Sequence, residues 1–339
     1  MKKLIQLIIL FISFAYSKGG IVSGFISDSS SGEALIGANV MIQETGQGMA
    51  TDINGYYIIQ NINPGSYTLM ASYVGFRVSR IQIILSDEES IKKDIEMVED
   101  LVQLTQVDVT AEKLQRRNNI QPSKINLSPR MMKAAPALAE PDLFRTIQAL
   151  PGVLTTSEYS TGLVIRGGNT DQNLIMLDGI TVYNPSHLGG VFSNFIVDGV
   201  KEAELIKGAY NAEYGGRLSA VLNVISREGN QKEFKGKANI SLLSAQTTLE
   251  GPFYKGAWIL SGRRTYFDLV LPKVLPDNIA TNIPPYFFYD VQGHIFSDIS
   301  SKDRFSLSYY TGIDDILFDT FGLDGRWGNN TISGHWRRV

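Results

Sequence analysis

Alternation of apolar and polar residues runs through the last third of the chain. It is clearest at 288–299 and recurs at 304–310. A period of two predicts β-strands whose two faces meet different surroundings. In 288–299, one face carries Tyr289, Val291, Gly293, Ile295 and Ile299, and the other carries Asp290, Gln292, His294 and Asp298.

Less regular alternation predicts further strands around these two. The apolar phase slips at Leu242-Leu243, and Arg263-Arg264 interrupts another segment. Apolar residues outward and polar residues inward is the pattern that a water-filled transmembrane barrel requires. The strands expected in residues 231–339, which we call the wall, number about five and include 237–250, 257–267 and 326–339.

A different pattern fills residues 126–230, where one short helix precedes strand–turn units. The segment 141–153 predicts a helix with one apolar face; Pro141 suits its first turn, and Pro151-Gly152 ends it. Glycine-marked turns separate the strands that follow. These strands are Leu163–Arg166, Asn173–Leu177, Ile180–Val182, Ala203–Lys207 and Ala220–Ser226.

Residues 18–98 predict a small antiparallel β-sandwich. Asn54-Gly55 is a strong hairpin signal, because both residues tolerate positive φ. Asp52 and Asn54 are spaced as in a calcium loop, but Asn61 stands where that loop needs a bidentate Glu, so we interpret the segment as a turn. The expected strands are Ile21–Ile26, Ala38–Gln43, Tyr56–Gln60, Tyr67–Tyr73 and Arg80–Leu85.

The first residues predict a secretory signal peptide, residues 1–17. Lys2 and Lys3 precede a short apolar core, and Ala15-Tyr16-Ser17 provides small residues at the spacing of a cleavage site. The core is too short to remain as a membrane-spanning helix. An uncleaved anchor or a buried first helix is the alternative.

Residues 99–125 form a polar connector. Within it, 104–113 alternates small and β-branched residues. This pattern suits a strand that pairs with the sheet edge of another protein, or the last strand of the sandwich.

The first domain resembles a known family. SGEALIGANV (31–40), TDINGYYI (51–58) and INPGSYTLMASYVGF (62–76) are similar to the carboxypeptidase-regulatory-like domain. Ala34 and Ile36 stand where that family usually has proline.

Residues 126–230, which we call the plug region, carry five motifs in this order: LPGV (150–153), IRGG (165–168), LDGI (177–180), ELIKG (204–208) and AEYGGRLSAVLNV (212–224). With these motifs the region resembles the plug domain of TonB-dependent outer-membrane transporters. Ala209 stands where many members have proline.

The two resemblances imply a mainly β chain: signal peptide, small antiparallel β-sandwich, linker, α+β plug domain, and the first strands of an incomplete transmembrane β-barrel. A plugged barrel has roughly 22 strands, so we expect this chain to be the front part of a longer transporter. The implied protein lies in the outer membrane, contacts its lipid, and imports a scarce bulky solute with energy from the inner membrane. Its ligand is unknown.

The resemblance also implies particular residues. In this family a TonB box, which binds the periplasmic TonB-type energy-transducing protein, lies just before the plug. The candidate box is Val107, Asp108, Val109, Thr110 and Ala111. Charged residues in or beside apolar strands need partners, and candidates for plug–barrel contacts, with ordinary surface pairs as the alternative, are Arg166, Glu204, Lys207, Glu213 and Arg217.

Composition narrows the function classes. The net charge of −3 comes without a basic stripe, which argues against nucleic acid as a partner. The chain has no cysteine, which excludes disulfides, thiolate metal sites and a lipoprotein anchor. His187, His294 and His335 have no acidic residue at metal-ligand spacing, and we expect them on polar surface.

We therefore predict no enzyme, no cofactor and no metal. The sequence has no P-loop, dinucleotide fingerprint or nucleophile elbow. A zinc carboxypeptidase is the enzyme alternative, since such enzymes also carry the regulatory-like domain. A secreted or periplasmic β-sandwich adhesion or scaffold protein is the other alternative, but it leaves the plug region and the wall unexplained.

Overall fold

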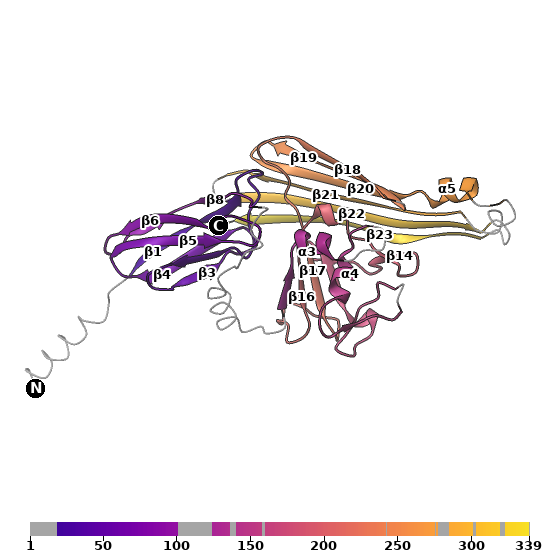
Figure 1. Cartoon of the computed structure of the whole chain (residues 1–339), viewed down its shortest axis with the longest axis horizontal. Coiled ribbons are helices and arrows are strands. Elements are labelled where there is room, and N and C mark those ends of the chain that lie inside the picture. Colours follow the sequence, from indigo (N-terminus) through magenta and orange to yellow (C-terminus); the bar gives the residue numbers. More distant parts are fainter. Residues whose placement is uncertain are drawn as a thin grey trace, which may run out of the picture. The chain divides into compact units, whose positions relative to one another are not determined.

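The computed structural model describes residues 19–100, 124–135, 140–157, 160–241, 243–274, 276, 285–300, 303–318 and 323–338. The chain divides into two compact units, residues 1–119 and 120–339. Figure 1 draws both. The predicted signal peptide and the candidate TonB box lie outside the described residues.

Two sheets form the first unit. The first has the order β4-β1-β7, with β8 also on β1, and the second has the order β3-β2-β5-β6. Their strands are β1 (Gly20–Asp28), β2 (Asn39–Ile42), β3 (Gly48–Ala50), β4 (Tyr56–Ile62), β5 (Gly65–Ser72), β6 (Ser79–Leu85), β7 (Ser90–Lys92) and β8 (Ile95–Met97).

The five strands that the sequence predicts in this unit correspond to β1, β2, β4, β5 and β6. The other three have three residues each, too short to show a period. β7 and β8 pair with β1 in parallel, so the sandwich is not wholly antiparallel. Alternate residues of both sheets form one core, which includes Val22, Val40, Tyr57 and Leu69.

The turn before β4 requires glycine. Gly55 has φ +74°, and a Cβ there would lie 2.6 Å from the carbonyl oxygen of Ile26. The Asp52 carboxylate accepts the backbone N–H groups of Asn54 (2.8 Å) and Tyr56 (2.9 Å). The carboxylate is therefore engaged in the turn, as the interpretation of this segment as a hairpin requires.

A five-stranded mixed sheet is the centre of the plug region. Its order is β13-β12-β17-β16-β9. β12 and β17 are parallel, whereas the other pairs are antiparallel. The strands are β9 (Lys124–Leu127), β12 (Leu174–Leu177), β13 (Ile180–Thr181), β16 (Val200–Ile206) and β17 (Val221–Ser226).

Short helices and hairpins complete the plug region. One buried cluster joins residues of the sheet, such as Leu205 and Val224, to Phe144 and Ile147 of the helix α4. The elements are α3 (Pro129–Ala134), α4 (Leu143–Gln148), the 3-10 turns η1 (Thr170–Gln172) and η2 (Val197–Gly199), and the hairpins β10 (Val153–Leu154) with β11 (Val164–Ile165) and β14 (Ser186–His187) with β15 (Phe192–Ser193).

Helix α4 is shorter than the sequence predicts. Asp142 is its N-cap, and its carboxylate accepts the backbone N–H of Arg145 at 3.0 Å. Pro141 therefore precedes the cap instead of occupying the first turn. Leu143, Phe144 and Ile147 are buried as expected.

The wall is a six-stranded antiparallel sheet in which each strand pairs with the next. The sequence predicts about five strands, because 237–250 reads as one. The chain reverses between Ile240 and Ser244, where the apolar phase slips. The elements are β18 (Lys235–Ile240), β19 (Ser244–Phe253), β20 (Gly256–Thr265), α5 (Phe267–Val274), β21 (Tyr286–Asp298), β22 (Asp303–Phe318) and β23 (Leu323–Arg338).

The two faces of the wall differ as the alternation predicts. Asp290 and Gln292 on β21 are buried, whereas Phe305 and Tyr309 on β22 belong to the exposed large apolar residues. Figure 1 shows the plug region on one side of this sheet. In the described part of the chain, none of the helices is both long enough and apolar enough to cross a membrane.

Candidate functional site

The plug region meets the polar face of the wall through a buried cluster of charged side chains. On the plug side it contains His187 of β14 and Glu140, which precedes α4. On the wall side it contains Arg263 of β20, Asp290 of β21 and Asp314 of β22. All five side chains are at most 2% exposed. We call these five residues the His187 cluster.

His187 bridges two wall strands. Its Nδ1 lies 2.7 Å from Asp314 Oδ2, and its Nε2 lies 2.8 Å from Asp290 Oδ1. The next backbone N–H, that of Leu188, donates to Asp314 Oδ1 at 3.0 Å. The tip of the β14–β15 hairpin is thus tied to β21 and β22 by both side-chain and backbone groups.

Arg263 connects the remaining members. Its Nε donates to Asp290 Oδ2 at 2.8 Å, and its Nη1 donates to Glu140 Oε1 at 2.6 Å. Its Nη2 also donates to the backbone carbonyl of Ser193 in β15 at 2.7 Å. One guanidinium therefore binds one wall carboxylate and two parts of the plug region, which suits its fork of donors.

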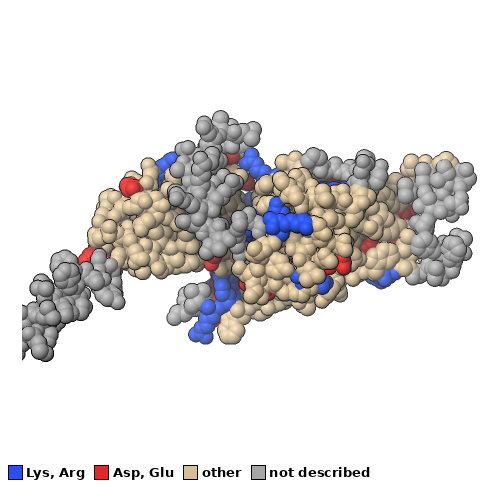
Figure 2. Space-filling model, turned by 90° about the horizontal axis from the view of Figure 1, so that it is seen from below, with Lys and Arg blue, Asp and Glu red and all other residues tan. Residues whose placement is uncertain are grey.

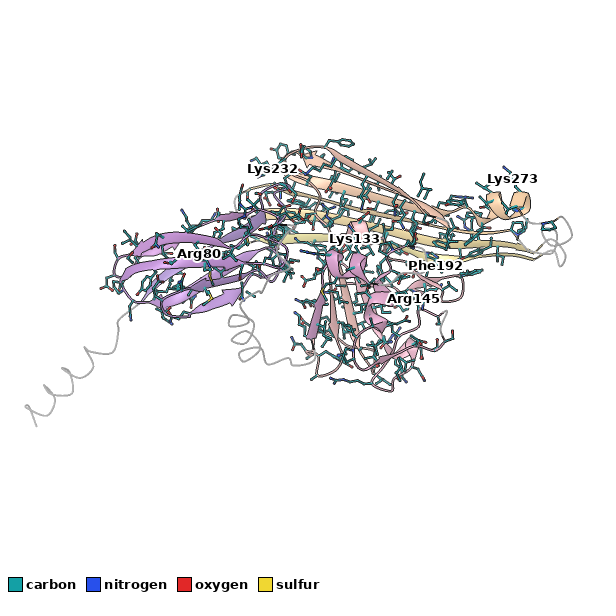
Figure 3. All side chains as sticks on the ribbon, in the orientation of Figure 1. Arg80, Lys133, Arg145, Phe192, Lys232 and Lys273 are labelled. Carbon is teal, nitrogen blue, oxygen red and sulfur yellow. The ribbon has the colours of Figure 1, made fainter. Side chains whose placement is uncertain are left out.

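Aromatic rings surround the cluster. The His187 ring stacks on Phe288, with centroids 4.1 Å apart and planes at 5°. Tyr286 donates its hydroxyl to Asp314 at 2.5 Å, and Tyr310 donates to Asp290 at 3.1 Å. Phe192 of β15 joins Tyr286 and Phe288 in one apolar cluster, and Figure 3 labels it at the boundary between the plug region and the wall. These rings exclude water from the charged groups.

The surroundings of His187 act on its charge in opposite directions. Burial disfavours the imidazolium, but the negative charge of Asp290 and the hydrogen bonds to Asp290 and Asp314 outweigh burial, so the pKa of His187 is raised. Arg263 opposes this increase. Two carboxylates contact the ring, and Glu140 and Arg263 complete the cluster, so a positive imidazole reduces the net negative charge of the cluster.

A second group of ion pairs joins the two regions near η2. Asp198 binds Lys133 of α3 and Lys237 of the wall strand β18, each at 2.6 Å. Burial would raise the pKa of Asp198, but these two ammonium groups lower it below its ordinary value. Figure 3 labels Lys133 on the side of the plug region that faces the wall. Figure 2 shows other charged residues scattered over the face seen from below.

The chain that leaves the plug region is also tied to the wall. Arg227 binds Glu250 of β19 at 2.7 Å, and Glu228 lies 3.4 Å from Arg304 of β22. Gln292 of β21 donates to the backbone carbonyl of Gly199 in η2 at 3.2 Å. Polar contacts from the plug region therefore reach each wall strand from β18 to β22.

Four of the five charged residues predicted as plug–barrel contacts make side-chain polar contacts inside the plug region. Glu204 pairs with Lys124 of β9. Lys207 donates to the carbonyl of Pro151, and Glu213 accepts from Asn211. The other two are Arg166, whose guanidinium lies beside Gly208, and Arg217, which donates to the carbonyl of Gly216. Contact of these five residues with a barrel stays a prediction.

The sequence pattern does not predict the His187 cluster. The expectation that His187 lies on polar surface is wrong, since its side chain is 0% exposed. The alternation puts Asp290 on the polar face of its strand, and Arg263-Arg264 interrupts another strand. Both features signal that this face meets charged groups. Within the described residues, no group of three or more acidic or histidine side chains is arranged to hold a metal ion.

Comparison with known families matches two domains. The model of the CarboxypepD_reg-like domain matches residues 22–109, and that of the TonB-dependent Receptor Plug Domain matches residues 127–221. These are the two families that the sequence motifs resemble, in the same order along the chain.

Two relatives are named as TonB-dependent proteins. The chain is 24% identical over 241 residues to the TonB-dependent transporter Oar of Myxococcus xanthus, covering 67% of this chain and 22% of that protein. It is 28% identical over 233 residues to the TonB-dependent receptor P26 of Formosa agariphila, covering 64% and 22%. The chain thus spans about a fifth of the length of these relatives.

Among solved structures, the ferric enterobactin receptor PfeA of Pseudomonas aeruginosa matches with 18% identity and a TM-score of 0.46. The match covers 66% of this chain and 39% of that one. The siderophore receptor PirA of the same organism matches with 17% identity and a TM-score of 0.42, covering 59% and 35%.

The chain carries a CarboxypepD_reg-like domain followed by a TonB-dependent Receptor Plug Domain. The relatives to which it is similar are a TonB-dependent transporter and a TonB-dependent receptor.

Proposed function

We propose that this chain acts in an outer-membrane receptor that imports a scarce, bulky solute with energy from the inner membrane. The observation that supports this most strongly is the buried polar contact between the plug region and one face of an antiparallel sheet. A plug held by hydrogen bonds and ion pairs can separate from its wall without exposing a large apolar surface to water.

Loop lengths give the orientation of the proposed barrel. Two residues, 254–255, separate β19 from β20, and four separate β21 from β22. At the opposite end, twenty residues that include α5 separate β20 from β21. In transmembrane barrels the short turns are periplasmic and the long loops extracellular, so α5 belongs to the outer side.

The partner is proposed to be a TonB-type protein that binds near Val107–Ala111 and pulls. The first described strand after that segment is β9, which pairs with β16 from Lys124↔Ile206 to Leu127↔Ala203. The ion pair between Lys124 and Glu204 adds to this pairing. A pull on the preceding linker therefore acts first on a four-residue edge strand, which is the easiest part of the plug sheet to detach.

We also propose that the five charged residues predicted as plug–barrel contacts touch the barrel. Charge-neutral variants of Arg166 and Arg217 test it, because both side chains lie near glycine turns of the plug region. If these side chains contact the barrel, neutralising their charge weakens the binding of the plug to the barrel. If they pair only within the plug region, this binding stays unchanged.

Uptake in a host that lacks its own TonB-dependent receptors tests the function. Radiolabelled ferric siderophores, cobalamin and oligosaccharides are the probes, since the solute is not identified. We expect at least one probe to accumulate only when both the receptor and TonB are present. Recovery of the receptor as a soluble periplasmic protein, or accumulation that does not require TonB, contradicts the proposal.

Replacement of Val109 by proline is the matched test of the TonB box. Proline removes a backbone donor and disturbs a paired strand. Uptake should fall to the level seen without TonB, whereas the receptor should still reach the outer membrane. An unchanged uptake rate contradicts the assignment of the box.

A further inference from the structure

We propose that the His187 cluster is a proton-dependent latch, in which the doubly protonated His187 ring fastens the β14–β15 hairpin of the plug to the wall and loss of one proton loosens it. The latch deepens the proposed function, since it specifies what holds the plug. Its chemistry rests on contacts within residues 120–339.

Hydrogen-bond counting requires a proton on each ring nitrogen. Both nitrogens of His187 lie within 2.8 Å of a carboxylate oxygen. A neutral imidazole has a single N–H, and an ionised carboxylate can only accept. The two bonds can therefore both form only if the ring is an imidazolium or if a carboxyl group carries the extra proton.

The other donors place that proton on the ring. Asp314 Oδ1 accepts from the hydroxyl of Tyr286 and from the N–H of Leu188. Asp290 Oδ1 accepts from Tyr310, and Asp290 Oδ2 accepts from Arg263. These fixed donors favour negative charge on the oxygens that they reach. An imidazolium then lets both ring nitrogens donate to the two carboxylates.

The charge balance favours the same state. The charged groups that face His187 or its partners are Asp290, Asp314 and Glu140 on the negative side and Arg263 on the positive side. With an imidazolium the cluster carries three negative and two positive charges. After proton loss, one buried cation faces three buried anions, which is costly in a site closed to water.

Proton loss affects the hairpin more than the rest of the plug. A neutral His187 ring must release either Asp290 or Asp314. The hairpin then keeps the backbone bonds of Leu188 and Ser193 and the bond from Asn329 of β23 to the carbonyl of Asn184. The ion pairs of Asp198 near η2 do not involve this ring. Loosening therefore starts at β14–β15.

The pH range follows from the raised pKa of His187. A group whose pKa is higher in the folded state stabilises that state fully at low pH and loses its contribution as pH rises through the raised value. The latch is therefore closed at and below the ordinary histidine value of 6.5 and opens as pH rises through the raised pKa, which lies above 6.5.

Wall residues make room for this geometry. Arg263 and Asp290 are directly opposite on β20 and β21, and Asp290 is opposite Gly312 on β22. A Cβ at Gly312 would lie 2.0 Å from the Tyr310 hydroxyl and 2.6 Å from Asp290 Oδ1. Glycine at 312 is thus required for Tyr310 to reach Asp290 beside Asp314.

A single cysteine in the hairpin measures the latch, since the chain has no cysteine of its own. Ser193 is suitable because it is fully buried and its hydroxyl has no hydrogen-bond partner in the structure. The maleimide labelling rate of Ser193→Cys is measured from pH 5.5 to 9 in the receptor in outer-membrane vesicles. Division by the rate of Leu218→Cys, at an exposed plug position, removes the intrinsic pH dependence of thiol reactivity.

We expect the rate ratio to rise by about tenfold or more across this range, since one pKa unit corresponds to a tenfold change in the protonation equilibrium. His187→Gln, which never carries the charge, should give a high ratio that does not depend on pH. The control His335→Gln, at an exposed wall histidine that contacts Ser333 and the backbone carbonyl of Asp178, outside the β14–β15 hairpin, should retain the wild-type profile.

Asp314→Asn supplies a second readout if His187→Gln does not fold. It keeps an acceptor for the ring but removes one negative charge, so the midpoint of the profile should move to lower pH. A residue with only a packing role would not shift this midpoint. A flat wild-type profile, or a pH dependence that persists in His187→Gln, overturns the latch. Neither result bears on TonB-dependent uptake, which is measured separately.

Discussion

Glu202 offers the sharpest test of the energetics inside the plug region. Its side chain lies on β16, next to a register shift opposite β17, and the residue is only 5% exposed. Its Oε2 has no hydrogen-bond partner in the structure. Burial and then the negative charge of Glu204 raise the pKa of Glu202 from 4.5 to about 7.

The magnitude follows from that increase. One pKa unit corresponds to about 1.4 kcal/mol, so holding Glu202 ionised in the folded plug costs about 3 kcal/mol. The folded state binds the proton more tightly than the unfolded state. The contribution of Glu202 to stability is therefore highest below pH 4.5, falls as pH rises to 7, and is constant above.

Glu202→Gln removes this pH dependence. The free energy of plug unfolding in the variant, relative to wild type, should increase by about 3 kcal/mol between pH 4.5 and pH 8. An amide nitrogen left without a partner would cost about 1–3 kcal/mol at every pH. The difference between the two pH values is therefore the quantity to compare.

Urea titration of the receptor in detergent measures this free energy, with a dye on a single cysteine at the exposed plug position Leu218. Glu204→Gln, two residues away, is the comparison variant: it removes the charge that adds to burial in raising the pKa of Glu202, so it should reduce the pH dependence without abolishing it. It breaks the partly buried pair with Lys124 and should destabilise the plug by about 1 kcal/mol at pH 7. Identical pH profiles for wild type and Glu202→Gln would refute the reasoning.

Two further substitutions test the local structure. Gly55→Ala should destabilise the sandwich by at least about 1 kcal/mol, because it adds strain at φ +74° and a clash with β1. Thermal unfolding is compared with that of Gly46→Ala, where φ is +71° but the space around a Cβ is open, so the difference measures the clash. Equal losses of stability in the two variants contradict the clash. Asp142→Ala should destabilise the plug by about 2 kcal/mol, because it removes the cap of α4 and leaves the buried N–H of Ser193 without its acceptor. A change below about 0.5 kcal/mol in the free energy of urea unfolding contradicts this stabilising role of Asp142.

Much of the fold could be predicted because the pattern of neighbouring residues in the sequence determines where strands form. The alternation at 288–299 identified the face of β21 that is buried, including Asp290 and Gln292. The slip at Leu242-Leu243 was visible in the sequence, but a periodicity argument could not decide between an irregular strand and a hairpin. The short strands β7 and β8 were missed because three residues show no period.

The site was less predictable because its contacts are distant in sequence. His187 lies 103 residues from Asp290, and Arg263 lies 123 residues from Glu140. The residues near His187 in the sequence do not indicate that its ring contacts two carboxylates. The family resemblance implies a role for charged residues within the plug strands, whereas the members of the His187 cluster lie in the hairpin β14–β15, just before α4, and on the wall.

A disulfide between the plug region and the wall tests the central claim that the plug sits on the wall and must move for import. A Cβ at Gly199 would lie 3.1 Å from Ser261 Oγ, close enough for a bridge between cysteines at these positions. Cells that carry the Gly199→Cys/Ser261→Cys receptor are grown under conditions in which uptake depends on the receptor. The disulfide should form spontaneously, and uptake should stop until a reductant is added. Absence of the bond, or full uptake with the bond intact, contradicts the account.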